Sequence, residues 1–326
     1  MKKKLVLVIG SNSFAGSHMC SFLLKKNFIV IGVSRSKIQQ LFMPFDIKNK
    51  FFNFYQLDIN YNLKYLISII RKYKPKYIIN YAAQGMVSES WKNPLHWYQT
   101  NIISHIKLVE SIKNLKFIKK YINFSTPEVY GSTSGIVREN LNFKPTTPYA
   151  LSRATADYHL INLNKFFNFP IIFTRTSNIY GPHQKLYRII PKTIMSCLKK
   201  KIIYLHGFGK SVRSFIFIED VSSATYKIIQ KGIIGETYHI STNKFISIKN
   251  LVKKINKMLI KKKLYKNAKD RIGKDKYYLL SSDKIRTKLK WKDKVSLDLG
   301  LDLTVKWIKN NFKPLSRMQM EYVHKK

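Results

Sequence analysis

The sequence predicts an α/β fold, a doubly wound parallel sheet with helices on both faces and a smaller lobe after it. Short apolar runs alternate with helix-like stretches through the first half of the 326 residues, and this pattern is typical of a parallel sheet covered on both faces. The first run, residues 5–9, breaks into Gly10-Ser11-Asn12-Ser13-Phe14-Ala15-Gly16 and then into a helix-like segment. This order of strand, glycine turn and helix seats a dinucleotide pyrophosphate on backbone N–H groups and the positive end of the helix dipole.

The expected elements follow one another in a regular order. Strands are expected at residues 4–9, 28–33, 52–57, 77–81, 121–125 and 171–175, and helices at 14–26, 63–73, 94–115 and 149–167. Ligands in such folds bind beyond the carboxyl ends of the strands, and Gly10, Arg35, Asp58, Ala82, Thr126 and Asn178 each come just after one. We expect residues 1–180 to form a dinucleotide-binding domain of the Rossmann type and residues 181–326 a smaller C-terminal substrate-binding lobe. Segments near 212–242, at 215–218 and 237–240, are expected to return to the main sheet.

The composition excludes some classes of function. The net charge of +43 invites a nucleic-acid function, but the lysines are scattered over every segment instead of gathering in one patch, which favours a solvated basic surface. No apolar run approaches the ~20 residues of a membrane-spanning helix. The two cysteines, Cys20 and Cys197, lie far apart and give neither a disulfide framework nor metal-ligand spacing. The sequence therefore predicts a cytoplasmic protein with no membrane association and no metal site.

The glycine turn and the ends of the next two strands predict the dinucleotide site. The expected contacts in the turn are Gly10, Asn12, Ser13, Phe14, Ala15 and Gly16, with Ser13 in place of the usual middle glycine. The second strand ends in Arg35-Ser36 with no acidic residue. An acid there would hold the adenosine ribose of NAD, whereas an arginine accommodates the 2′-phosphate of NADP, so NADP is slightly favoured over NAD. Asp58, followed by Ile59, either faces the adenine or caps a helix.

The chemistry is predicted at Thr126, Glu128, Tyr149 and Arg153. A tyrosine four residues before a cation on a helix places both side chains on one face. The cation stabilises the phenolate and lowers the pKa of Tyr149 from ~10 toward working pH, as general-base catalysis requires. Thr126 can hydrogen-bond the same substrate hydroxyl. The pair Pro148-Tyr149, which opens a helix 23 residues after Thr126, distinguishes this arrangement from an ordinary helix pair.

Taken in order, these motifs resemble the extended short-chain dehydrogenases/reductases, in the branch of NAD(P)-dependent nucleotide-sugar epimerases and dehydratases, and above all the dTDP-glucose and GDP-mannose 4,6-dehydratases. The resemblance covers nearly the whole chain: the glycine turn, Asp58-Ile59, Tyr81-Ala82-Ala83-Gln84, the 126–131 motif, the Tyr149 helix, the 175–182 segment, and the segments around Arg213 and Arg271. It implies that Ala82, Ala83, Gln84 and Asn101 also contact the cofactor. It further implies that Asn178, Arg188, Arg213 and Arg271 hold the substrate, with the arginines on its diphosphate.

By that resemblance, Tyr149 takes the C4-hydroxyl proton of a nucleotide-diphosphate sugar while the C4 hydride passes to the nicotinamide. Glu128 then removes the C5 proton, and loss of the C6 hydroxyl with return of the hydride gives a 4-keto-6-deoxy sugar. Pro127 stands where the dTDP-glucose enzymes carry a proton-donating aspartate, and Arg153 replaces the family's lysine. A 4-epimerase of the same fold and a non-catalytic protein that binds dinucleotides or nucleic acid therefore stay open as alternatives. The resemblance also implies a homodimer that pairs through the helices at 94–115 and 149–167.

Overall fold

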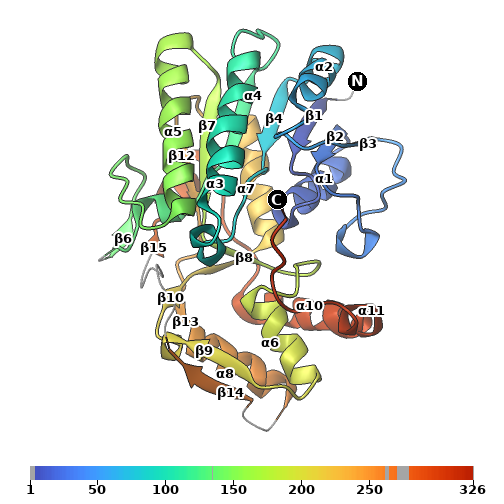
Figure 1. The fold of residues 1–326 in the computed structure, drawn as a ribbon, viewed down its shortest axis with the longest axis vertical. Coiled ribbons are helices and arrows are strands. Elements are labelled where there is room, and N and C mark those ends of the chain that lie inside the picture. Colours follow the sequence, from blue (N-terminus) through green and yellow to red (C-terminus); the bar gives the residue numbers. More distant parts are fainter. Residues whose placement is uncertain (1–3, 134, 261–263, 270–278, 326) are drawn as a thin grey trace.

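The computed structural model describes residues 4–133, 135–260, 264–269 and 279–325. The centre of this part of the chain is a sheet of seven parallel strands in the order β12-β7-β5-β4-β1-β2-β3 (Figure 1). Its strands are β1 (Leu5–Ile9), β2 (Ile29–Ser34), β3 (Phe52–Gln56), β4 (Tyr77–Asn80), β5 (Lys120–Phe124), β7 (Ile171–Thr176) and β12 (Thr237–Ile240). The strand order reverses beside β1, which confirms the predicted doubly wound fold and directs ligands to the carboxyl ends of the strands there.

Helices cover both faces of the sheet. One face carries α1 (Phe14–Lys25) and α7 (Ile218–Lys231), and the other carries α2 (Leu63–Tyr73), α4 (His105–Ile112) and α5 (Pro148–Phe167). The alternation of side chains along β1 shows why both layers are needed, because Val6 and Val8 pack into the first layer while Leu7 and Ile9 pack into the second. All four side chains are buried, as a parallel strand between two helical layers requires.

The helix expected at 94–115 is less regular than predicted. It consists of α3 (Pro94–Tyr98), a π-helical stretch (Gln99–Ser104) and α4. The π-helical stretch carries Asn101, whose fully buried side chain accepts a hydrogen bond from the Gln84 backbone N–H (2.8 Å) and donates to Ser152 Oγ (2.9 Å). Such stretches are frequent at functional sites, and this one fixes the chain that follows β4.

Most of the remaining elements build the smaller lobe, below the sheet in Figure 1, while α9 packs against α7 and β12, and β6 and β15 lie at the side of the sheet. The helices are α6 (Ile189–Leu198), α8 (Ile248–Leu259), α9 (Asp283–Leu289), α10 (Leu297–Asn310) and α11 (Phe312–Ser316). The short strands are β6 (Ile136–Val137), β8 (Asn178–Tyr180), β9 (Ile203–His206), β10 (Val212–Arg213), β11 (Phe215–Phe217), β13 (Ile246–Ser247), β14 (Tyr265–Ala268) and β15 (Leu279–Leu280). Helices α6, α8 and α10 share one apolar cluster, which holds this lobe together.

The two segments expected to return to the main sheet behave differently. Residues 237–240 do return, as β12 beside β7. Residues 215–217 do not, because β11 pairs with β8 in a separate two-stranded sheet. The reason lies at the end of β7, where the Ser177 N–H still donates to Ile240 O (3.1 Å) while the next N–H, that of Asn178, donates to Ser214 O (3.1 Å). The chain therefore leaves the main sheet at residue 178, and from there it pairs with β11.

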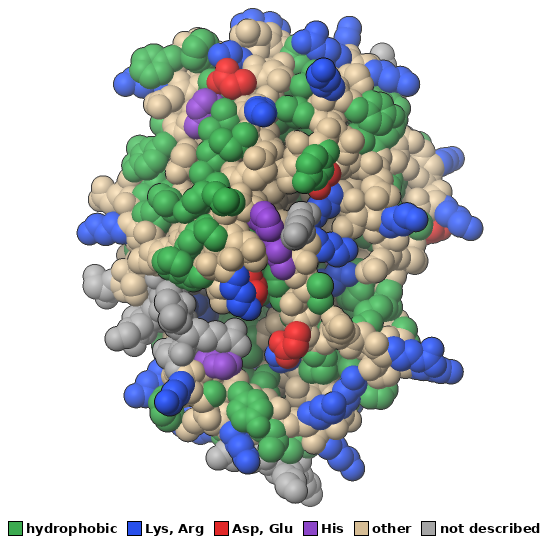
Figure 2. All heavy atoms as spheres, in the orientation of Figure 1, with side chains coloured by type: hydrophobic (Ala, Val, Ile, Leu, Met, Phe, Trp, Pro, Cys, Tyr) green, Lys and Arg blue, Asp and Glu red, His purple; other side chains and the backbone are tan. Residues whose placement is uncertain are grey.

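The surface agrees with a scattered distribution of charge. Figure 2 shows lysine and arginine side chains spread around the rim of this face, with no single basic patch over one element. Among the helices that the structure describes, none combines the length and apolar character needed to cross a membrane.

Candidate active site

The glycine turn after β1 brings the start of α1 close to the chain after β4. Gly10 has φ of +83°, and a Cβ there would lie 2.7 Å from the Ala82 backbone nitrogen, so both the turn and the close approach require glycine. Ser13 has ordinary extended backbone angles and caps α1, because its Oγ accepts the Gly16 N–H at 3.1 Å. The serine at this position is therefore compatible with the turn, and it leaves the first amides of α1 facing the crevice.

The ends of β2 and β3 form the next wall of the crevice. Asn12 Nδ2 donates to the Ser36 carbonyl at 2.7 Å, and Gln56 Nε2 donates to the Arg35 carbonyl at 3.2 Å. These bonds fix the backbone that carries the Arg35 guanidinium. The Asp58 carboxylate stabilises the turn that it begins, because its Oδ1 accepts the Asn60 N–H at 2.8 Å.

Thr126, Pro127 and Glu128 lie directly after β5, at the start of a short 3₁₀ helix (Pro127–Tyr130). Thr126 is the N-cap of this helix, and its Oγ1 also donates to the Glu128 carboxylate. Pro127 takes the first helical position, where its missing N–H costs nothing and its fixed φ is favourable. The turn therefore presents a hydroxyl and a carboxylate that are already hydrogen-bonded to each other.

Tyr149 and Arg153 lie one turn apart in α5, as predicted from their spacing. Helix α5 begins after the N-cap Thr147, whose hydroxyl accepts the Ala150 N–H at 3.1 Å. Arg153 is 1% exposed; its Nη2 donates to the Phe124 carbonyl at 2.6 Å, while its Nε and Nη1 are buried without a hydrogen-bond partner among the described residues. Unsatisfied buried donors are costly, so two donors are held ready for an acceptor that enters the crevice.

The pKa of Tyr149 departs from the expectation. Burial, and then the negative charge of Glu128, raise it to about 12, while Arg153 and the Thr126 hydroxyl act in the opposite direction. Arg153 therefore stabilises the phenolate as predicted, but in the protein alone its effect is smaller than the cost of removing the phenolate from water.

A buried polar network lies behind the Thr126 turn. The Asp157 carboxylate accepts from Arg175 Nη2 (2.9 Å), Ser125 Oγ (2.6 Å) and Asn123 Nδ2 (3.0 Å). Arg175 in turn donates to the Tyr130 hydroxyl at 3.1 Å. The network thus holds the two ends of the segment that presents Thr126 and Glu128.

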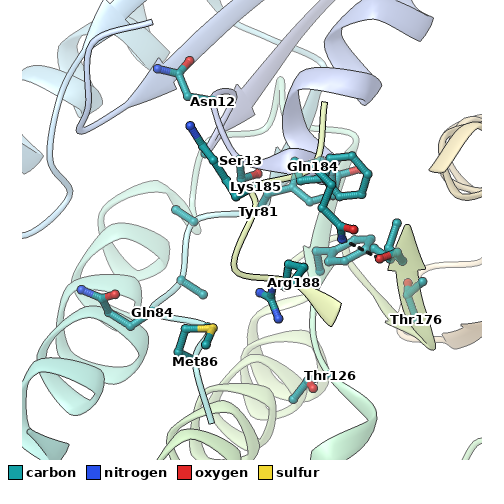
Figure 3. Close-up of a pocket in the computed structure, with 18 of the residues that line it drawn as sticks. Asn12, Ser13, Tyr81, Gln84, Met86, Thr126, Thr176, Gln184, Lys185 and Arg188 are labelled. Atoms are coloured by element: carbon teal, nitrogen blue, oxygen red, sulfur yellow. Dashed lines mark hydrogen bonds between the residues drawn. The ribbon is translucent and has the colours of Figure 1, made fainter. Parts of the chain in front are cut away.

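These parts surround one cavity of about 720 Å³, seen in close-up in Figure 3. Its lining includes most of the predicted residues: Gly10, Asn12, Ser13, Phe14, Ala15, Arg35, Ser36, Asp58, Ile59, Ala82, Ala83, Gln84, Thr126, Glu128, Tyr149, Arg153, Asn178 and Arg188. In Figure 3, Arg188 lies between the turn that carries Ser13 and the Thr126 end of the cavity. A volume of this size is typical of a site for an extended organic ligand.

Three predicted residues that the structure describes do not line the cavity. Gly16 lies against the turn, where a Cβ would collide with the Gly10 carbonyl oxygen, and Asn101 holds the Gln84 backbone from behind. Arg213 is 8% exposed in β10, with its Nη1 donating to the Val212 carbonyl at 2.8 Å, and it does not line the cavity. Arg271 lies outside the described residues.

The cavity also has walls that the sequence did not predict. Lys185 and Tyr187 follow the Gly181-Pro182 turn, and Tyr322 comes from the far end of the chain. Burial, and then the charge of Lys325, lower the pKa of Lys185 to about 8, and its Nζ lies 3.3 Å from the centre of the Phe42 ring. Lys185 and Tyr187 come just after the 175–182 segment, so their place near the site could have been inferred from that motif. No pattern in the sequence connects Tyr322 with the glycine turn.

The chain is similar to known proteins over nearly its whole length. A family model described as GDP-mannose 4,6 dehydratase matches residues 7–304. The dTDP-D-glucose 4,6-dehydratase of Dictyostelium discoideum is 32% identical, over 94% of this chain and 82% of its own. The structure of dTDP-glucose 4,6-dehydratase from Bacillus anthracis in complex with NAD has a TM-score of 0.86 at 29% identity, covering 96% of this chain and 99% of that chain. UDP-glucuronic acid 4-epimerase from Bacillus cereus, in complex with UDP-glucuronic acid and NAD, also has a TM-score of 0.86, at 28% identity, covering 94% and 99%.

Proposed function

We propose, because the chain belongs to the GDP-mannose 4,6 dehydratase family, that it is an NAD-dependent nucleotide-sugar 4,6-dehydratase. The observation that carries this proposal is the carboxylate of Glu128, which is hydrogen-bonded to Thr126 and lines the same cavity as Tyr149. Loss of water from a hexose requires a base for the C5 proton, and a simple 4-epimerisation does not. Within this proposal, residues 1–180 supply the dinucleotide site and residues 181–326 most of the substrate site.

The residues present fit a nicotinamide dinucleotide. The Gly10 turn and the N-terminus of α1 line the cavity and offer an anion site, and the close approach of this turn to the Ala82 backbone depends on glycine at position 10. The two donors of Arg153 that have no described partner suit ribose hydroxyls. When bound, the nicotinamide would supply a hydride acceptor that gives the hydride back within one turnover. The Gly10 turn and Arg153 would hold and orient this group.

The first proton transfer belongs to Tyr149, which takes the proton of the C4 hydroxyl while Thr126 hydrogen-bonds the same oxygen. Its raised pKa means that the phenolate needs positive charge nearby. Arg153 supplies such charge permanently, since a guanidinium stays protonated. It cannot relay protons as a lysine can, so Arg153 positions and stabilises while Tyr149 alone moves the proton.

Glu128 carries out both parts of the elimination. Once C4 is a ketone, the C5 hydrogen is acidic, and the Glu128 carboxylate removes it. Pro127 is buried and has no proton to give, so the carboxyl formed on Glu128 returns this proton to the C6 oxygen as the C–O bond breaks and water leaves. One carboxylate thus acts as base and then as acid.

The experiment compares Glu128→Gln with wild type on a panel of nucleotide hexoses, beginning with the dTDP-glucose of the relatives' names. Wild type should form a product lighter by one water, and Glu128→Gln should slow this step at least ~10²-fold, the usual range for one acid–base group. Glu236→Gln, a change at a surface carboxylate paired with Lys284, is the matched control. A wild type that yields only C4 epimers, with Glu128→Gln unimpaired, would show that the chain is a 4-epimerase, the alternative that Pro127 favours.

The substrate diphosphate is proposed to meet Arg188, which lines the cavity and lowers the pKa of Tyr149. Arg213 and Arg271 remain predicted diphosphate contacts of the same proposal. For the cofactor we propose NAD, the dinucleotide bound in the similar structures, and those structures give no support to a preference for NADP. Arg35 is the residue that would admit a 2′-phosphate, and titration with both dinucleotides decides between them.

We further propose that two copies pair through α3, α4 and α5. These helices, with the π-helical stretch between α3 and α4, carry exposed apolar side chains, among them Leu95 (73% exposed), Ile103 (44%), Tyr158 (43%) and Phe166 (66%). Figure 2 shows hydrophobic side chains gathered over this side of the molecule, and apolar patches of this kind mark association surfaces. We also propose that the protein is cytoplasmic.

A further inference from the structure

The chain after α11 crosses the mouth of the cavity. In Figure 1 this red segment rises from the corner of α10 and α11 and ends beside α3 and α1. At its start, Glu321 pairs with Lys192 of α6 at 2.6 Å, and the Tyr322 ring meets the Tyr187 ring edge-on at 5.2 Å. Residues 321–325, which we name the strap, therefore begin on the smaller lobe.

The other end of the strap is attached to the dinucleotide half. The His324 ring stacks on Trp97 of α3 at 4.9 Å and 14°, and its Nε2 lies 2.8 Å from His96 Nδ1. The Lys325 carbonyl accepts from Gln84 Nε2 at 3.0 Å and from Arg35 Nη1 at 3.3 Å. The strap thus bridges the two lobes over the cavity.

The strap is also part of the cavity wall. Tyr322 lines the cavity together with Arg35 and Gln84, the residues that Lys325 joins. A dinucleotide lying along the glycine turn would pass beneath this bridge, and it could not leave toward the strap without breaking the contacts of Lys325. The strap therefore lies across an exit path.

The charges indicate that a bound anion and a closed strap stabilise each other. Arg35 and Lys185 both line the cavity, and the strap brings Lys325 close to both of them. The charge of Lys325 acts unfavourably on the ammonium of Lys185. A dinucleotide pyrophosphate placed among these cations would relieve their mutual repulsion. Closure is therefore expected to be more favourable with the dinucleotide bound.

We propose that the strap retains the dinucleotide: it closes over the bound molecule and must open before the molecule is exchanged. This inference rests on the proposed function, because a reaction that returns its hydride regenerates the cofactor in every turnover, so that release serves no purpose. Tyr322, His324 and the Lys325 carbonyl are then cofactor-retaining groups far from the glycine turn in sequence.

The test measures the rate at which bound NADH leaves, by stopped-flow fluorescence after mixing with excess NAD. One variant ends at Met320, which keeps Met318 and Met320 packed on the apolar cluster of the smaller lobe. A second variant, His324→Ala, removes only the ring that stacks on Trp97. Val323→Ala is the matched control, because Val323 is 58% exposed.

Deleting the strap should raise the dissociation rate at least ~10-fold, as expected for losing one or two ordinary hydrogen bonds and a stacked ring. His324→Ala should raise it several-fold and keep the proposal testable if the shortened chain does not fold, while Val323→Ala should match wild type. If NADH leaves both strap variants at the wild-type rate or more slowly, the proposal that the strap retains the dinucleotide is wrong, while the dehydratase proposal is unaffected. A wild type that binds no dinucleotide overturns both proposals.

Discussion

Breaking the buried ion pair between Asp157 and Arg175 is expected to destabilise the protein strongly. Both side chains are 0% exposed, and the carboxylate accepts three donors, from Arg175, Ser125 and Asn123. In Asp157→Asn an NH₂ group replaces one accepting oxygen, so one donor faces another donor. The Arg175 guanidinium also loses the countercharge at 2.9 Å. The substitution keeps the shape of the side chain and removes its charge.

Removing one partner of a buried ion pair costs about 3–5 kcal/mol, because the other charge stays buried without compensation. An unfolding entropy of about 2.1 cal/mol/K per residue gives roughly 0.7 kcal/mol/K for 326 residues. The melting temperature should therefore fall by about 4–7 °C. The same chemical change at the surface, Glu110→Gln, affects contacts with Lys113 and His159 in which the carboxylate is 38% exposed, and should cost less than about 1 kcal/mol.

The assay is urea unfolding of wild type, Asp157→Asn and Glu110→Gln without ligand, with linear extrapolation to water. Scanning calorimetry of the same three proteins gives the melting temperatures. If Asp157→Asn lowers the free energy of unfolding by no more than Glu110→Gln does, the buried pair does not hold the Thr126 turn in the way described above.

Three further predictions follow from the site and the surface. Gly10→Ala, which places a Cβ where φ is +83°, should weaken NAD binding at least ~10-fold in calorimetric titration, whereas Gly135→Ala, which lies outside the cavity lining and has nothing within 4 Å of its Cβ, should bind normally. Arg153→Met removes a charge that lowers the pKa of Tyr149, so the pH at which kcat rises should move upward; an unmoved profile contradicts the role of Arg153. Phe166→Glu should convert a wild-type dimer into a monomer in sedimentation experiments, and a dimer that persists would place the interface elsewhere.

Most of the fold could be predicted because two local signals coincide in it. Short apolar strands such as residues 5–9, separated by helices, strongly favour a parallel sheet. The glycine turn fixes one end of that sheet as the ligand edge, and Gly10 meets this requirement with a positive φ. The spacing of Tyr149 and Arg153 on one helix also gave their shared face correctly.

What could not be predicted depends on contacts between distant segments. The pairing of β11 with β8 is decided at Ser177, where consecutive amides bond to different strands, and strand-like character alone does not choose a partner. The pKa of Tyr149 is set chiefly by burial, which the helix spacing does not reveal. Tyr322 reaches the cavity through ring contacts with Tyr187 and its neighbours, and no motif records such contacts.

Ser13 and Pro127, the two most conspicuous departures from the expected motifs, share a physical explanation. Ser13 is the N-cap of α1 with extended backbone angles, and Pro127 is the first residue of a 3₁₀ helix capped by Thr126. Serine and proline are favoured at these two positions for backbone reasons alone. Ser13 is therefore compatible with a dinucleotide-binding turn, and Pro127 with the backbone of the Thr126 turn. Pro127 secures the turn and offers no proton, so in the mechanism we propose the whole acid–base task of the elimination falls on Glu128, the one carboxylate that this turn presents to the cavity.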